Sequence, residues 1–308
     1  MRELLVDLVS WGVERILALQ STSGNAFDAL FCAITWLGDA YVYLALLPLA
    51  LWGSDTRRAM RLALLFLFSI YVNLMLKGLF AIPRPFLISF AVQAKDAVTG
   101  YAFPSGHAQG VTALWVGLAL IYRRRWPLAL GALLIPLVSF SRVYLGVHYP
   151  QDVFGGVAVG LAITGAYGLM QSPLRRWWRR RPTRVRVALC VIVPLVMAGL
   201  ASDPDAQAVC GAILGLALGR ILGVPWTEAQ PVPGSMPLVL RLLTGAGFVG
   251  LTYFIVARTL EATWAGGTLP AIVAHYAIVG LAVSLGAPWL FVRLKLSVAS
   301  IPRRAPER

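Results

Sequence analysis

The stretch AMRLALLFLFSIYVNLMLKGLFAIPRP, residues 59–85, decides the fold class, because a long apolar run ends in basic residues. Residues 62–76 carry no charge, and a helix of about 20 such residues crosses the roughly 30 Å hydrocarbon core of a bilayer. Lys77 and Arg84 follow at the end of the run. Ionisable residues at a membrane boundary are costly and are functional by default. The stretch therefore predicts a membrane span with functional cations at its end.

The composition extends this interpretation to the whole chain. Of its 308 residues, 58% are hydrophobic and only 13% are charged, whereas a soluble domain is about a quarter charged. Disorder and a secreted disulfide scaffold are excluded, and the three cysteines show no metal-ligand spacing. The net charge of +14 does not indicate nucleic-acid binding, because the apolar runs leave no surface for a basic groove. We expect an all-α, polytopic transmembrane bundle.

Nine spans are expected, and their alternation predicts which face is cytoplasmic. Alternation gathers most of the 27 Lys and Arg residues on one face, which the positive-inside rule makes cytoplasmic. The protein is therefore expected in a membrane, and the expected membrane is the bacterial inner membrane. The spans are 26–52, 58–80, 106–122, 127–147, 152–171, 186–202, 206–222, 237–258 and 268–292.

Changes in composition divide the chain into five segments. The N-terminal segment has apolar residues at helical spacing and is expected to be an amphipathic helix at the membrane interface, with Trp11 and Ile16 on its apolar face. In the portion of the chain after residue 186, here called the back portion, one glycine recurs every four residues, which lets helices approach closely. These glycines are Gly211, Gly215, Gly219 and Gly223. The segments are an interfacial helix at 1–25, a catalytic transmembrane core at 26–171, a basic cytoplasmic loop at 172–186, transmembrane helices of unknown role at 187–296 and a basic tail at 297–308.

Three clusters of polar residues occur where a membrane protein should be apolar. Under the alternating topology all three reach the extracytoplasmic face, although the topology argument did not use them. This agreement favours a single site. The clusters are Lys77-x6-Arg84-Pro85, Pro104-Ser105-Gly106-His107 and Ser141-Arg142-x5-His148-x3-Asp152.

The cations in these clusters predict a phosphate site. Lys77, Arg84 and Arg142 supply three positive charges, and arginine offers paired donors to phosphate oxygens. Ser105 and Gly106 open a helix after a proline, so free backbone amides and the positive end of the helix dipole are available to an anion. We expect phosphate binding without a metal or any other cofactor.

The two histidines in the clusters have different surroundings, which predict their roles. His148 precedes Asp152 by one helical turn, so the carboxylate can accept from one ring nitrogen and leave the other as a nucleophile. His107 has no carboxylate near it in sequence and is better placed as a general acid for the leaving group. Attack by His148 would form a phosphohistidine that water then hydrolyses.

The three clusters together resemble the three-part signature of the type 2 phosphatidic acid phosphatase (PAP2) superfamily of lipid phosphate phosphatases. Every signature position is filled between Lys77 and Asp152, and the resemblance covers about residues 26–171. It implies that His148 is the nucleophile and His107 the acid of a metal-independent reaction on the extracytoplasmic or lumenal side. The helices of the back portion are not part of the core family pattern.

The resemblance leaves the substrate and the reaction open. Polyprenyl diphosphate, phosphatidic acid, phosphatidylglycerophosphate and sphingoid-base phosphate all fit a lipid phosphatase. A lipid phosphotransferase would use the same residues, and a transporter would bind phosphate without cleaving it. The expected partners are a lipid phosphate and the bilayer, while the oligomeric state stays open.

Two further ionisable residues lie within expected spans. His275 is expected to be a structural, hydrogen-bonded histidine. Asp39 is expected to pair with Asn73 or a backbone group, with contact to the site as the alternative.

Overall fold

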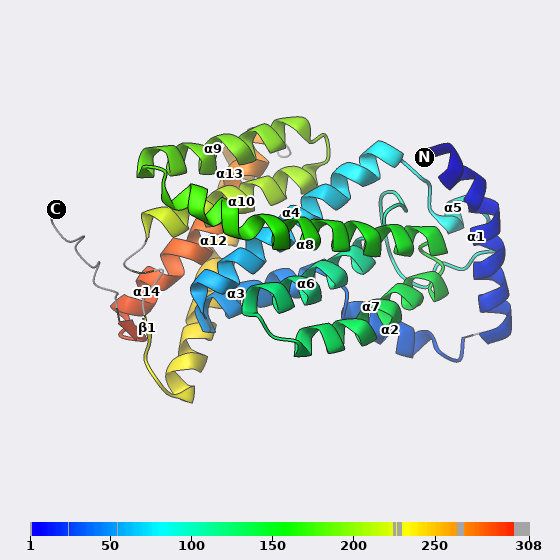
Figure 1. Cartoon of the computed structure of the whole chain (residues 1–308), viewed down its shortest axis with the longest axis horizontal. Coiled ribbons are helices and arrows are strands. Elements are labelled where there is room, and N and C mark those ends of the chain that lie inside the picture. Colours follow the sequence, from blue (N-terminus) through cyan, green and yellow to red (C-terminus); the bar gives the residue numbers. More distant parts are fainter. Residues whose placement is uncertain are drawn as a thin grey trace. The chain divides into compact units, whose positions relative to one another are not determined.

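The computed structural model describes residues 2–23, 25–53, 55–223, 226, 230–263 and 268–298. These residues are almost entirely helical, which confirms the expected all-α fold (Figure 1). The elements are α1 (Arg2–Ser23), α2 (Asp28–Trp36), α3 (Ala40–Gly53), α4 (Thr56–Phe80), α5 (Pro85–Ile88), α6 (Gly106–Tyr122), α7 (Trp126–Tyr144), α8 (Pro150–Arg179), α9 (Thr183–Leu200), α10 (Pro204–Leu222), β1 (Gln230–Pro231), α12 (Ser235–Thr263), α13 (Leu269–Leu281), the π-helix η1 (Ala282–Gly286), α14 (Ala287–Arg293) and β2 (Ser297–Val298).

Eight helical segments of the described chain are long and apolar enough to cross a membrane, one fewer than expected. The remaining expected span, 106–122, is α6, whose 17 residues rise only about 25 Å. Most of α6 is buried inside the protein. The eight segments are Asp28–Gly53, Thr56–Ile88, Trp126–Tyr144, Pro150–Arg179, Thr183–Leu200, Pro204–Leu222, Ser235–Leu260 and Leu269–Arg293.

Several boundaries differ from those expected from the sequence. The first expected span is two helices, α2 and α3, which are separated at residues 37–39. Much of the expected loop 172–186 is helical, because α8 continues to Arg179 and α9 begins at Thr183. Long basic side chains leave backbone helix formation intact, since Arg is a good helix former. Residues 299–308 of the expected basic tail lie outside the described residues.

The chain forms two compact units, each made of two stretches of sequence. Unit 1 consists of residues 1–44 and 68–172, and unit 2 consists of residues 45–67 and 173–308. Unit 1 contains all three polar clusters. Unit 2 contains most of the back portion and also residues 45–67, which precede the first cluster.

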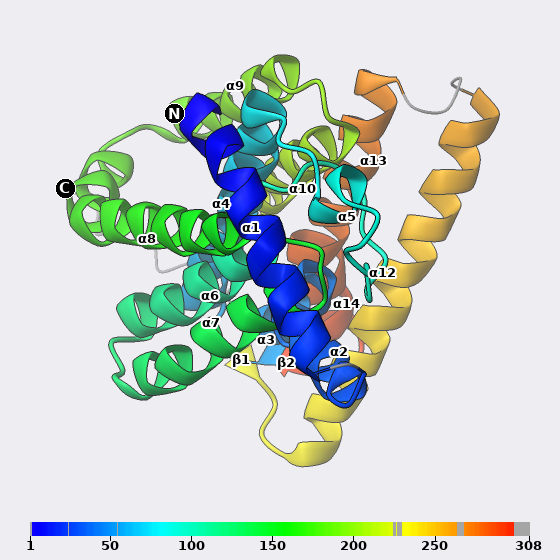
Figure 2. The ribbon, with the colours of Figure 1, turned by 90° about the vertical axis from the view of Figure 1, so that its right-hand side faces the viewer.

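Within unit 1, α1 packs across the start of α8 (Figures 1 and 2). Ile16 is fully buried in a cluster with Tyr149, and Gly12 lies so close to Tyr149 that an added Cβ would meet its ring at 2.8 Å. Trp11, expected on the same face as Ile16, is instead 42% exposed. The packed face of α1 is therefore the one that carries Val9, Gly12, Val13 and Ile16.

Helices α6 and α8 of unit 1 approach closely through two glycines of α8. A Cβ on Gly156 would lie 2.5 Å from the carbonyl oxygen of Ser105, and one on Gly160 would lie 2.8 Å from Cβ of Thr112. Small residues at such contacts are what allow membrane helices to pack backbone against backbone. This approach brings the start of α6, with the second cluster, against the start of α8, with the third.

In unit 2, α10 and α13 pack side by side through the expected glycine ridge. A Cβ on Gly211 would lie 2.5 Å from the carbonyl oxygen of Val273, and one on Gly215 would lie 2.0 Å from that of Ala277. A Cβ on Gly219 would meet Oγ of Ser284. The predicted close approach is confirmed for these three glycines, whereas Gly223 caps the end of α10.

A π-helical turn links α13 to α14 in unit 2. The amide of Ala287 donates to the carbonyl of Ala282, five residues earlier. In this register the carbonyl of Val283 would accept from residue 288, which is a proline and has no N–H. The indole Nε1 of Trp52 donates to that carbonyl at 3.0 Å instead. The π-helix is thus held by a side chain from α3.

Gly215→Ala should destabilise unit 2. The added methyl collides with the backbone of α13, and overpacking of this kind costs about 1–3 kcal/mol. Gly247→Ala in α12 is the control, because a Cβ there meets nothing within 4 Å and gains only helix propensity. We expect the melting temperature in detergent to fall for Gly215→Ala and to hold or rise for Gly247→Ala. Equal behaviour of the two variants would contradict the close packing.

Candidate functional site

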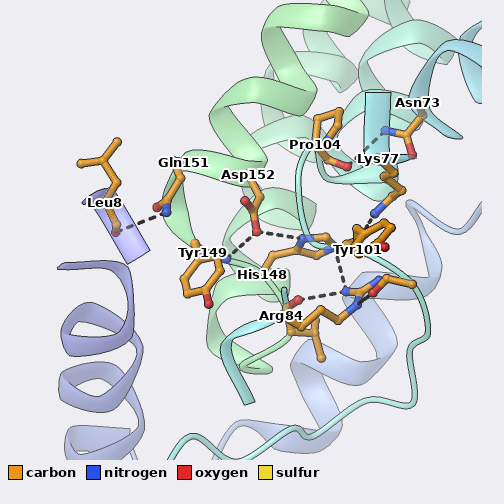
Figure 3. Close-up of polar contacts among 12 residues, drawn as sticks. Leu8, Asn73, Lys77, Arg84, Tyr101, Pro104, His148, Tyr149, Gln151 and Asp152 are labelled. Carbon is orange, nitrogen blue, oxygen red and sulfur yellow. Dashed lines mark hydrogen bonds and ion pairs between the residues drawn. The ribbon is translucent and has the colours of Figure 1, made fainter. Parts of the chain in front are cut away.

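His148 and Asp152 form the centre of the site at the start of α8 (Figure 3). Oδ2 of Asp152 accepts from Nδ1 of His148 at 3.2 Å and from the backbone amide of Tyr149 at 2.8 Å. Asp152 is fully buried and His148 is 2% exposed. The carboxylate caps the helix and orients the imidazole ring at the same time. The predicted pairing of these two residues is present.

The turn before α8 places His148 against the rest of unit 1. Gly146 adopts a φ of +71°, a conformation that favours glycine, and a Cβ there would lie 2.4 Å from the carbonyl oxygen of Gln93. Pro150 at the first turn of α8 lacks the N–H that a helix start would leave unpaired. The sequence Gly-x-His-x-Pro thus fixes a tight connection between α7 and α8.

The hydrogen bonds of His148 define its tautomer. Nδ1 carries the proton that Asp152 accepts, so Nε2 is left with its lone pair and lies 3.4 Å from NH1 of Arg84. Burial, together with the positive charges of Lys77 and Arg84, lowers the pKa of His148 well below its usual range. The ring is therefore neutral at pH 7, which is the form that acts as a nucleophile.

Backbone carbonyl groups hold Arg84 in place beside His148. Nε donates to Gly100 at 2.9 Å, NH2 to Thr99 at 2.7 Å and NH1 to Val147 at 2.9 Å. Because the acceptors are neutral, they fix the guanidinium without cancelling its charge. Lys77, in the last turn of α4, donates from Nζ to the carbonyl of Tyr101. Both cations of the first cluster reach the site (Figure 3).

The second cluster opens α6 next to Asp152. The amide of Ser105 donates to the backbone carbonyl of Asp152 at 2.9 Å. Its hydroxyl Oγ is buried and has no hydrogen-bond partner among the described residues, and it does not cap the helix. A buried polar atom without a partner is rare and calls for a ligand or water. Ser105 thus offers a hydroxyl to a ligand, and Gly106 offers the start of a helix.

Asn73 and Gln109 brace the start of α6, a role the sequence did not reveal. Nδ2 of Asn73 donates to Oε1 of Gln109 at 2.8 Å and to the carbonyl of Pro104 at 3.2 Å. Nε2 of Gln109 donates to the carbonyl of Ser69 at 2.7 Å. Polar residues inside a membrane bundle bond to one another. This network ties α4 to α6 directly behind the second cluster.

Asp39 pairs with a backbone group, as expected, and also reaches the site, which was the alternative, while no bond to Asn73 is found among the described residues. Its Oδ2 lies 3.8 Å from Nε2 of His107, and its Oδ1 accepts from the amide of Tyr41 at 2.7 Å. Asp39 stands at the break between α2 and α3, where Gly38 packs against His107 and Val138. The sequence placed Asp39 in the middle of a span, and the break explains how its carboxylate reaches a histidine.

Arg142 reaches the same region from the last turn of α7 and is fully buried. Its NH1 donates to Oγ1 of Thr35 at 2.5 Å and to Oδ2 of Asp96 at 2.6 Å, while Nε has no partner among the described residues. Asp96 offsets the charge of Arg142, whereas no carboxylate among the described residues forms an ion pair with Arg84. The contacts of Thr35 and Asp96 with Arg142 were not predicted from the sequence. The one available signal was an acidic residue between the first two clusters.

The eight expected site residues all belong to unit 1 and come from four elements and the loops between them. No cluster of three His, Cys, Asp or Glu side chains that could hold a metal occurs in the described parts of the chain. His275, expected to be structural, lies in unit 2, where its ring stacks on that of Tyr276 at 5.0 Å.

Two family models match the chain, one over each portion. The model described as PAP2 superfamily matches residues 58–178, which include all three clusters. The model described as PAP2 superfamily phosphatase, transmembrane extension, matches residues 207–300. The second match covers the helices to which the sequence analysis assigned no role.

Curated relatives align along much of the chain. Lipid phosphate phosphatase delta of Arabidopsis thaliana is 26% identical over 84% of this chain and 68% of its own length. Sphingosine-1-phosphate phosphatase 2 of Mus musculus is 27% identical over 73% of this chain and 68% of its own. Undecaprenyl-diphosphatase of Sulfolobus acidocaldarius is 30% identical over 49% of this chain and 74% of its own. No solved structure matches the chain significantly. The family models and these relatives show that the chain belongs to the PAP2 superfamily.

Proposed function

We propose that the protein hydrolyses the phosphate ester of a membrane lipid through a phosphohistidine formed on His148. The observation that carries the proposal is the position of His148 between Asp152, which accepts a hydrogen bond from its Nδ1–H, and Arg84, which lies beside its unprotonated Nε2. The names of the relatives, all lipid phosphatases or diphosphatases, support the same class of reaction. Integral membrane placement follows from the family extension and the eight apolar helices.

In the first step, Nε2 of His148 attacks phosphorus, the N–P bond forms and the P–O bond to the lipid breaks. His107 gives a proton to the departing alkoxide, and Asp152 stabilises the imidazolium. In the second step, water attacks phosphorus, gives a proton to His107 and releases inorganic phosphate as the N–P bond breaks. The two steps together restore the starting protonation of the enzyme.

The transferring phosphoryl group carries its charge on three nonbridging oxygens, which the cations are placed to stabilise. Arg84 and Lys77 lie beside His148, and Arg142 adds a third positive group. The Ser105 hydroxyl and the amide of Gly106 supply neutral donors. We propose that these groups do the work that a metal ion does in other phosphatases.

His148→Ala should lower phosphate release by at least about a thousandfold, as expected when a nucleophile is removed. His275→Ala, which removes a histidine from unit 2, should leave the rate within about twofold. The measurement is phosphate release from lipid–detergent micelles, with and without a chelator. Activity that survives in His148→Ala would contradict the phosphohistidine, and activity lost to the chelator would contradict the metal-free site.

We propose that a phosphomonoester is the preferred substrate over a diphosphate. The phosphatase relatives align over 84% and 73% of the chain, a length that extends into the back portion, whereas the diphosphatase aligns over 49%. The same release assay on sphingoid-base phosphate, phosphatidic acid, phosphatidylglycerophosphate and polyprenyl diphosphate ranks them directly. A higher kcat/KM for polyprenyl diphosphate than for every monoester would reverse this preference.

We propose that Asp39 orients the ring of His107 and stabilises its protonated form, so that His107 can act as the general acid. Its Oδ2 is 3.8 Å from Nε2 of His107, where its negative charge opposes the burial and the nearby cations Arg142 and Lys77 that lower the pKa of His107. Asp39→Asn should therefore lower kcat for a lipid phosphate about tenfold or more, because an alkoxide needs a proton to leave. For an aryl phosphate, whose phenolate leaves unaided, the loss should be within about twofold.

Asp152→Asn provides the contrast for this test, because it weakens the nucleophile and should slow both substrates alike. If Asp39→Asn slowed the aryl phosphate as much as the lipid phosphate, its role would be structural and the assignment to the acid would be wrong.

We propose that the site faces the extracytoplasmic side of a bacterial inner membrane. The positive-inside rule supports this orientation, since the turn at residues 123–125 is all arginine, whereas the loop at residues 89–105 contains a single basic residue, Lys95. Ala97→Cys in that loop and Arg124→Cys in the turn are both exposed positions. A membrane-impermeant thiol reagent added to whole cells should label Ala97→Cys and spare Arg124→Cys. The reverse pattern would place the site in the cytoplasm.

A further inference from the structure

Unit 2 contains a buried arginine that pairs with no carboxylate of the described residues. Arg241, in α12, is 3% exposed. Its NH2 donates to the carbonyl of Trp52, its NH1 lies 3.4 Å from Oγ of Ser297 and its Nε has no hydrogen-bond partner in the described part of the chain. No Asp or Glu among the described residues forms an ion pair with it. A buried charge without a partner is costly, and within a membrane it indicates a function.

Arg241 lines a pocket whose remaining walls are mostly apolar. The pocket has about 390 Å³ of empty space when its open mouth is counted, and the nearly covered guanidinium lies in its lining. Trp52, Met60 and Phe291 form apolar walls, and the Phe291 ring centre is 6.0 Å from Cζ of Arg241. This arrangement suits an amphiphile, whose anionic group would meet Arg241 while its apolar part meets the walls.

The walls are held in fixed positions. Trp52 is anchored by its indole bond to the π-helix at Val283 and by an edge-on ring contact with Phe291 at 5.7 Å. Ser284, which also lines the pocket, bonds to the carbonyl groups of Gly280 and Gly215. A preorganised pocket loses little conformational entropy when a ligand binds.

The pocket lies where helices of unit 2 begin and end. Trp52 is next to the last residue of α3, Thr56 is the first residue of α4 and Ser297 follows α14 in β2. Exposed arginines occur along the same helix ends, including Arg57 and Arg58 at the start of α4 and Arg293 at the end of α14. Helix ends rich in basic residues are where a membrane protein meets lipid headgroups.

From this placement we propose that the pocket binds the phosphodiester group of an anionic phospholipid. The unpaired Nε–H and the weakly bonded NH1 of Arg241 would donate to two phosphate oxygens, as paired guanidinium donors do. A single guanidinium balances a single negative charge, which is the charge of a phosphodiester. The lipid's glycerol and first acyl carbons lie along Trp52, Met60 and Phe291. The catalytic reaction does not enter this argument.

The test uses the purified full-length protein in a neutral maltoside detergent. The melting temperature is measured against increasing dioctanoyl phosphatidylglycerol, dioctanoylglycerol or inorganic phosphate. Dioctanoylglycerol has the same chains without the phosphate, and inorganic phosphate has no chains. We expect a saturable rise with dioctanoyl phosphatidylglycerol alone, since a ligand that binds only the folded state raises its stability.

Variants assign the effect to Arg241. Arg241→Gln should raise the dissociation constant for dioctanoyl phosphatidylglycerol at least about tenfold, because charged hydrogen bonds are lost. Arg58→Gln, which removes an exposed positive charge from the start of α4, should leave it within about twofold. Equal losses in the two variants would mean general charge attraction and would overturn the site.

Ser297→Asp keeps the proposal testable if Arg241→Gln does not fold. The new carboxylate would stand beside NH1 of Arg241 and take the place of the phosphate. We expect the lipid-free melting temperature to hold or rise while the response to dioctanoyl phosphatidylglycerol disappears, and Ser297→Asn to respond as wild type does. An unchanged response in Ser297→Asp, an equal response to dioctanoylglycerol, or an equal response to inorganic phosphate would each overturn the lipid site.

Discussion

The site depends on one buried carboxylate. Asp152 accepts through Oδ2 from the His148 ring and from the amide of Tyr149, and its backbone carbonyl accepts from the amide of Ser105. One residue thus fixes the ring of the proposed nucleophile, the first turn of α8 and the place where α6 begins. In water, each of these contacts would compete with solvent. In a buried, low-dielectric setting they are strong, and leaving any one of them unmade is costly.

Asp152 can make these contacts only because the backbones of α6 and α8 lie close together. Gly156 and Gly160 remove the side chains that would hold α6 away from α8, and Gly146 permits the turn that brings His148 next to Asp152. In a bilayer, lipid tails are as apolar as leucine, so helices gain little from apolar burial and rely on close packing and hydrogen bonds. Glycine and a few polar groups therefore position this chemistry more than large apolar side chains do.

Sequence patterns predicted the residues of the candidate site but not all of their partners. The membrane fold followed from apolar length, and the three clusters followed from polar residues in an apolar setting; both depend on composition over short windows. Asp96 and Thr35 were missed because their link to Arg142 joins residues 46 and 107 positions apart. The helix break at residues 37–39 was not predicted, because a break between two apolar runs leaves no signal in the sequence. The protein-facing side of α1 was not predicted either, since apolar spacing does not tell a protein-facing side from a lipid-facing one.

The charge balance of the two buried arginine environments argues for different ligands. Neutral carbonyl groups hold Arg84, so its full charge remains for a substrate, and Lys77 adds another beside it. Arg142 is paired with Asp96, so it offers less of its charge to a ligand than Arg84 does. A buried charge is stable only when it is balanced, which suits an anionic ligand beside Arg84. Arg241 presents one charge within apolar walls, which matches a diester monoanion attached to a lipid. The polar surroundings of Arg84 and the apolar walls around Arg241 thus favour different ligands on the same chain.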